Sequence, residues 1–90
     1  MEQIKNQITI LASKNETIKA IDTITELLFL NKVDHSIINK VSTALEEVLI
    51  NIVSYAYENT GNIDIIYELV TEPKKELSVT IIDNRVINFI

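Results

Sequence analysis

The fold is decided by residues 63–83, which read IDIIYELVTEPKKELSVTIID. Every second side chain in its two halves is apolar, and these side chains are Ile63, Ile65, Tyr67, Leu69, Leu77, Val79 and Ile81. A period of two is typical of a strand that buries one face. Between the halves, Glu72-Pro73-Lys74-Lys75 has the composition of a turn. The segments Ile63–Thr71 and Leu77–Asp83 are therefore predicted to form an antiparallel hairpin.

Three further elements are predicted before this hairpin. Residues 3–11 alternate apolar and polar side chains and predict a strand. Ser13 and Glu16 have the spacing of a capping box, which predicts a helix from there to about residue 31. Asp34 is a candidate N-cap for a second helix that continues to about residue 58, and Gly61 suits the position just after its end.

Both predicted helices carry an apolar face at helical spacing. In the first helix the expected face is Ile18, Ile21, Ile24, Leu27 and Leu28. In the second it is Ile37, Ile38, Val41, Leu45, Val48, Leu49, Ile52 and Ala56. The order β-α-α-β-β predicts an α+β fold with two helices packed on one face of a mixed or antiparallel sheet. We expect residues 1–90 to form a single domain.

The composition narrows the classes of function. The chain has 90 residues, 47% of them apolar, and a formal net charge of −5. An acidic chain without a basic run is poorly matched to nucleic acid, so no nucleic-acid partner is expected. No apolar run reaches the length of a membrane helix, and the first residues do not resemble a signal peptide. The acidic charge also disfavours anionic membrane surfaces, so no membrane partner is expected. Because cysteine is absent as well, a cytoplasmic location is expected.

The chemically informative residues lie in the second predicted helix. Glu47, Asn51 and Tyr55 are spaced four residues apart, so they follow one side of the helix. An Asn oxygen suits Mg²⁺, and a carboxylate one turn away can orient or deprotonate a hydroxyl. Glu46 is the alternative carboxylate, but the residue four positions after it is Ile50, which cannot bind a metal. The spacing alone also fits a solvated polar stripe.

The context of these residues resembles a known family. Glu47-Val48-Leu49-Ile50-Asn51 followed by Tyr55-Ala56-Tyr57 is similar to the N-box of the GHKL ATPases, the histidine kinase-like ATPase superfamily. It is most similar to the branch of anti-sigma-factor serine/threonine kinases. The element order also matches, and Asp83 follows the last predicted strand where the family opens its first glycine box. The resemblance implies a partial Bergerat-type ATP-binding fold.

The resemblance implies a role for each matching residue. Glu47 would be the catalytic base that activates a serine hydroxyl, and Asn51 would bind Mg²⁺. Tyr55, where relatives often carry His, would line the phosphate or ribose side of ATP. Asp83 would accept a hydrogen bond from the adenine amino group, and Asn84 would lie beside it. The implied partners are a sigma factor and its anti-sigma antagonist, together with a second copy in a homodimer.

Two departures from the family pattern bear on activity. Arg85 stands where relatives carry glycine, and its Cβ and long side chain would crowd the adenine. Relatives also continue with a mobile lid, a second glycine box and further strands, whereas this chain ends at Ile90. We therefore expect a C-terminally truncated domain that phosphorylates nothing by itself. The apolar end, residues 86–90, is expected to expose apolar surface and favour self-association.

Three functions follow from this sequence. The first is an ATP-dependent protein serine/threonine kinase that regulates transcription. The second is a catalytically inactive interaction or dimerisation module that keeps the fold without a complete nucleotide site. The third is a structural α+β domain in which the match to the N-box is coincidental.

Overall fold

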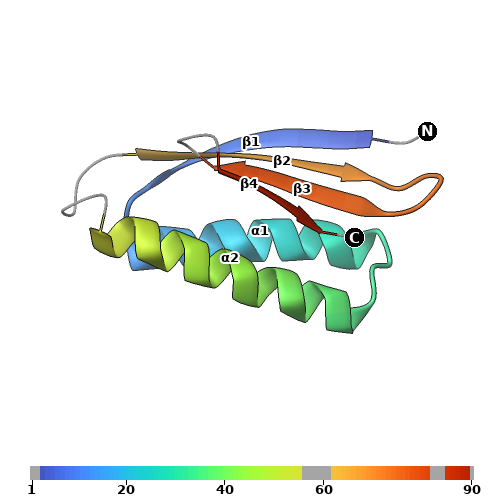
Figure 1. Cartoon of the computed structure of the whole chain (residues 1–90), viewed down its shortest axis with the longest axis horizontal. Helices are drawn as coiled ribbons and strands as arrows, with labels where there is room; N and C mark the ends of the chain where they lie inside the picture. The colour runs from blue at the N-terminus through green and yellow to red at the C-terminus, as the bar shows by residue number, and fades with distance from the viewer. Residues whose placement is uncertain (1–2, 56–61, 82–84, 90) are drawn as a thin grey trace. The chain divides into compact units, whose positions relative to one another are not determined.

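The computed structural model describes residues 3–55, 62–81 and 85–89 (Figure 1). The elements in chain order are β1 (Gln3–Leu11), α1 (Lys14–Leu30), α2 (His35–Tyr55), β2 (Asn62–Val70), β3 (Glu76–Ile81) and β4 (Arg85–Phe89). The α+β class and the order β-α-α-β-β are confirmed, and β4 adds a strand that the sequence did not predict. The chain divides into two compact units, one made of Met1–Thr9 and Ile63–Ile90 and the other of Ile10–Asn62.

The first unit is a sheet with strand order β1-β2-β3-β4. β2 and β3 pair antiparallel, with Ile65 opposite Ile81 and Leu69 opposite Leu77, so the predicted hairpin is confirmed. The seven alternating apolar residues of this hairpin are all buried, as predicted. Between β1 and β2, the Thr9 hydroxyl donates to the Asp64 carboxylate at 2.7 Å.

The fourth strand changes the interpretation of the apolar end of the chain. β4 pairs antiparallel with β3, with Val79 opposite Ile87 and Ile81 opposite Arg85. Backbone hydrogen bonds of an antiparallel ladder therefore hold residues 85–89. These residues belong to the sheet. The expectation that the end of the chain exposes apolar surface concerns side chains that lie outside the described part of the structure.

The second unit is a pair of helices that pack against each other, joined by a short connection at residues 31–34 (Figure 1). Ser13 is the N-cap of α1, and its hydroxyl accepts a hydrogen bond from the Glu16 N–H at 3.2 Å. The return hydrogen bond of the predicted capping box, from the Ser13 N–H to the Glu16 carboxylate, is replaced by other contacts. The Ser13 N–H donates to the Leu11 carbonyl, and the Glu16 carboxylate pairs with Lys19 at 3.4 Å.

The C-terminus of α1 closes in a Schellman motif. The Val33 N–H donates to the Leu28 carbonyl, and the Lys32 N–H donates to the Phe29 carbonyl, each at 3.1 Å. Lys32 occupies the left-handed position of the motif, with φ of 60°. The Asp34 carbonyl then accepts hydrogen bonds from Ile37 and Ile38 at the start of α2.

The buried face of α1 differs from the predicted one. The buried residues are Thr17, Ala20, Ile21, Ile24 and Leu28. Ile18, which was expected in the core, is 47% exposed, and Leu27 is half-buried. In α2 the prediction holds more closely, because Val41, Leu45, Leu49 and Ile52 are buried while Ile37, Ile38 and Val48 are half-buried.

Candidate functional site

The candidate site is a polar stripe along α2. Asn39, Thr43, Glu47 and Asn51 recur every four residues, so they follow one side of the helix. All four side chains are exposed. Val41, Leu45 and Leu49 lie on the opposite side of α2 and are fully buried. Because their burial fixes the rotation of α2, the polar stripe faces solvent.

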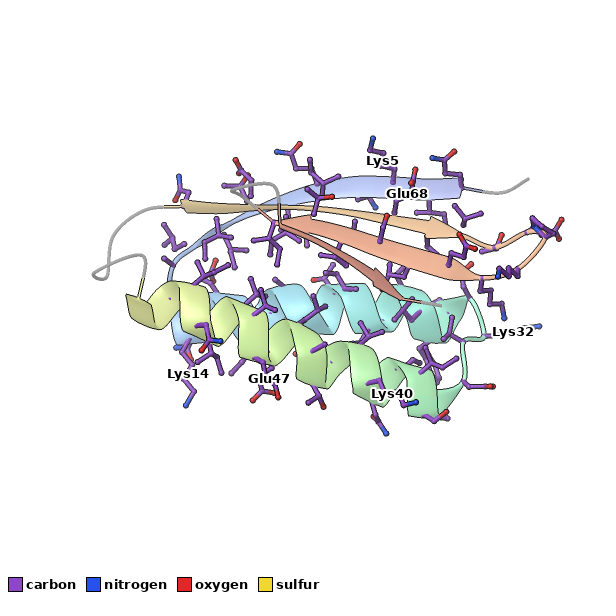
Figure 2. The ribbon with its side chains drawn as sticks, in the orientation of Figure 1. Lys5, Lys14, Lys32, Lys40, Glu47 and Glu68 are labelled. Atoms are coloured by element: carbon purple, nitrogen blue, oxygen red, sulfur yellow. The ribbon has the colours of Figure 1, made fainter. Side chains whose placement is uncertain are left out.

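Glu47 lines a shallow, wide-open hollow of about 370 Å³ on the exposed face of this helix. The other residues that line it are Asn39, Lys40, Thr43 and Ala44. Figure 2 shows Glu47 and Lys40 projecting from the same long side of α2. Glu47 forms no ion pair or hydrogen bond with another residue of the described part of the chain. Its carboxylate is therefore available to a ligand.

Asn51 lies one turn beyond Glu47, which is about 6 Å along the helix axis. Its exposed amide oxygen is a hard ligand of the kind that Mg²⁺ accepts. Among the described residues, no group of three His, Cys, Asp or Glu side chains is placed to hold a metal ion. A Mg²⁺ ion at Asn51 would therefore need most of its coordination shell from a bound phosphate and water.

Of the other predicted site residues, Tyr55 lies within the described part of the chain, whereas Asp83 and Asn84 do not. Tyr55 is the last described residue of α2. Arg85 is the first residue of β4 and pairs with Ile81. The position expected to carry glycine is therefore part of a backbone-paired strand.

Sequence reasoning missed the N-terminal half of the stripe. Asn39, Lys40, Thr43 and Ala44 share the hollow with Glu47 but were given no role. The signal was present, because Asn39 and Thr43 continue the four-residue spacing of Glu47 and Asn51 toward the helix start. It was overlooked because the resemblance covers only the C-terminal half of this helix.

Comparison with known proteins adds no assignment: no family model matches the chain, and no curated protein matches it. Among the described residues, no helix is both long and apolar enough to cross a membrane.

Proposed function

We propose that this chain is an ATP-binding domain of the anti-sigma-factor serine/threonine kinase type, acting in the cytoplasm on a sigma factor and its antagonist. The observation that carries the proposal is the placement of Glu47 and Asn51, exposed and one turn apart on the same side of α2. The α+β element order supports it, because the resemblance requires an N-box on the second helix, before the hairpin.

The residues of the stripe fit part of the chemistry that the family implies. Asn51 would hold Mg²⁺ together with the phosphates, and the ion would neutralise phosphate charge. Glu47 would orient the hydroxyl of the substrate serine and accept its proton. The hollow beside Glu47 leaves that carboxylate open to an incoming hydroxyl. Asp83 and Asn84 would complete the adenine side of the site.

Calorimetric titration of the 90-residue chain with ATP and Mg²⁺ tests the proposal. We expect saturable binding that requires Mg²⁺ and that Asn51→Ala abolishes, because the amide ligand is lost. Asn39→Ala is the matched control, since Asn39 is an exposed Asn on the same side of the same helix. Equal binding by the Asn51→Ala variant and the wild type would contradict the Mg²⁺ assignment.

A second titration separates the metal from the nucleotide. Because Asn51 has no cluster of acidic residues around it within the described chain, Mg²⁺ alone should release no binding heat. Glu47→Ala should leave nucleotide binding unchanged, since its proposed partner is the substrate hydroxyl. Loss of nucleotide binding in that variant would show that Glu47 has another role.

A catalytically inactive interaction module is the second candidate, and the β3–β4 pair favours it. Arg85 begins β4 in register with Ile81, so only residues 82–84 separate the two strands. A paired strand residue with a long side chain differs from the flexible glycine that the family places there. Arg85→Gly tests this candidate: nucleotide binding by the variant and none by the wild type would support the inactive module. Equally tight binding by both would exclude it.

A further inference from the structure

The hollow on α2 continues beyond Glu47 toward the start of the helix, and the proposed function uses only its Glu47 end. The residues that line it, Asn39 to Glu47, span about 12 Å along the helix axis. Small molecules bind in concave sites that enclose most of their surface. A shallow, open surface instead suits an extended peptide segment, which lies along it.

Lys40 supplies a positive charge to this hollow. It is exposed and forms no ion pair or hydrogen bond with another residue of the described chain. The residues one helical turn away, where an acid could pair with it, are Ser36, Ile37, Thr43 and Ala44. Lys19 of α1, by contrast, pairs with Glu16 at 3.4 Å. The Lys40 ammonium group is therefore available to an acidic group of a partner.

Two neutral donors lie beside Lys40. Asn39 and Thr43 line the same hollow and are exposed, and each is a near neighbour of Lys40 on the helix surface. An ammonium group, an amide and a hydroxyl together can hold a carboxylate through charge-assisted hydrogen bonds. The Glu47 end carries a carboxylate, which accepts hydrogen bonds. The two ends of the hollow therefore have opposite character.

The distance between the two ends matches a short extended segment. Lys40 and Glu47 project from the same side of α2 (Figure 2), about 10 Å apart along its axis. A polyproline II segment advances about 3.1 Å per residue with three residues per turn. Side chains three residues apart therefore point the same way, about 9 Å from each other. Between the two ends lies Ala44, whose small side chain leaves room for the segment to cross.

We propose that this hollow docks the substrate segment, and that Lys40 selects an acidic side chain three residues from the phosphorylated serine. The inference rests on the proposed function, which places the serine hydroxyl at Glu47. The carboxylate of the substrate accepts hydrogen bonds from the Lys40 ammonium group and from Asn39 or Thr43. Lys40 is thus a specificity-determining residue, and the backbone of the segment passes over Ala44.

An NMR titration of the full chain with alanine peptides that carry a central serine tests the docking site. One peptide has aspartate three residues before the serine, one has it three residues after, and one has it directly adjacent. We expect one of the first two to give saturable shifts of the Thr43 and Ala44 amide signals, with a dissociation constant on the order of 1 mM. The adjacent-aspartate peptide should bind about fivefold more weakly, because it cannot reach both ends.

Equal binding by all three peptides, or no saturable shift at roughly tens of millimolar peptide, would overturn the docking site. The peptide titration contains no nucleotide, so its failure is distinct from a failure of the proposed function. The absence of nucleotide binding in the calorimetric titration would contradict the kinase assignment itself.

Variants of Lys40 test its role in selection. Lys40→Gln should weaken binding of the favoured peptide about fivefold, whereas Lys40→Arg should keep the preference for aspartate three residues away. Lys40→Glu should reverse it, favouring a peptide with lysine at that position. Lys14→Gln is the matched control, because it removes an exposed lysine of α1 that forms no ion pair within the described chain. Equal weakening by Lys14→Gln and Lys40→Gln would show that overall charge drives binding, and would overturn the proposal.

Discussion

Thr17 is the buried polar residue of α1, and its hydroxyl has no partner within the described chain. Valine has nearly the same shape and a similar helix propensity, but it has no hydroxyl to desolvate. We therefore expect Thr17→Val to raise the free energy of unfolding by about 1 kcal/mol. For a domain of this size, that increase corresponds to a rise in Tm of about 4–8 °C.

Thermal unfolding followed by circular dichroism measures this effect, with Thr23→Val as the control. Thr23 is exposed, and its hydroxyl donates to the Lys19 carbonyl at 2.9 Å, so its replacement should change Tm little. A decrease in Tm for Thr17→Val would show that the hydroxyl is satisfied in solution.

Lys32 adopts a conformation that favours glycine. Its φ of 60° places a Cβ in the left-handed region, which costs a non-glycine residue about 1 kcal/mol. Lys32→Gly should therefore raise the free energy of unfolding by roughly 0.5–1 kcal/mol. The lysine side chain makes contacts of its own, and the loss of their stabilising free energy reduces this gain. Urea denaturation measures the change. Lys32→Ala removes the same contacts but keeps the Cβ, so an equal gain in that variant would contradict the argument from φ.

At the scale of elements, the sequence predicted most of the fold because local signals were strong. In both strands of the β2–β3 hairpin every second side chain is apolar, and this buried face came out as predicted. The limits of α1 were also clear, because Ser13 is its N-cap and Asn31 its C-cap. These features depend on side chains within a few residues of each other, which a sequence displays directly.

The rotation of α1 was less predictable. Ile18 lies about 100° around the helix from the centre of the buried face, while Thr17 lies near that centre. Ranking residues by hydrophobicity placed Ile18 inside and ignored Thr17, because threonine is polar. The partner helix decides which face is covered, and the sequence of one helix does not contain that information. β4 was missed for a similar reason, since its pairing depends on β3.

The candidate site was predicted only in part. Glu47 and Asn51 are exposed on one side of α2, as their spacing indicated. The hollow beside Glu47 also involves Lys40 and Thr43. A second hollow, lined by Lys14, Thr17, Ile50 and Val53, joins two helices. The residues around Glu47 lie on one helix, so their spacing was visible in the sequence. A hollow between two helices depends on side chains distant in sequence, so a spacing argument along one helix cannot find it.

The core face of α2 allows a direct comparison of two aliphatic residues. Leu45 is fully buried, whereas Ile50, five residues along the same helix, is 36% exposed. We expect Leu45→Ala to lower the free energy of unfolding by about 3 kcal/mol, because it loses burial and leaves a cavity. Ile50→Ala should cost less than about 1 kcal/mol. Urea denaturation with a common m-value would measure both changes, and similar losses would contradict the assigned rotation of α2.

At the scale of the whole molecule, the remaining question is how the sheet edges are covered. β1 has β2 as its only neighbour within the described sheet, and β4 has only β3. An edge strand presents unpaired backbone N–H and C=O groups that can pair with another chain. The exposed residues Leu11, Phe29 and Leu30 add apolar surface elsewhere. These features support the expected homodimer, and β4 contributes to it as a strand with one edge paired to β3.

Sedimentation equilibrium over a range of concentrations tests the dimer. We expect a dimer at micromolar concentration, because edge pairing and apolar contact both favour association while a net charge of −5 opposes it. Gln7→Lys tests whether the β1 edge takes part. Gln7 is exposed, so the added charge should weaken the dimer without affecting the fold. A dimer unaffected by Gln7→Lys but weakened by Leu30→Lys would place the contact on the helical pair, and a strict monomer at micromolar concentration would remove the homodimer altogether.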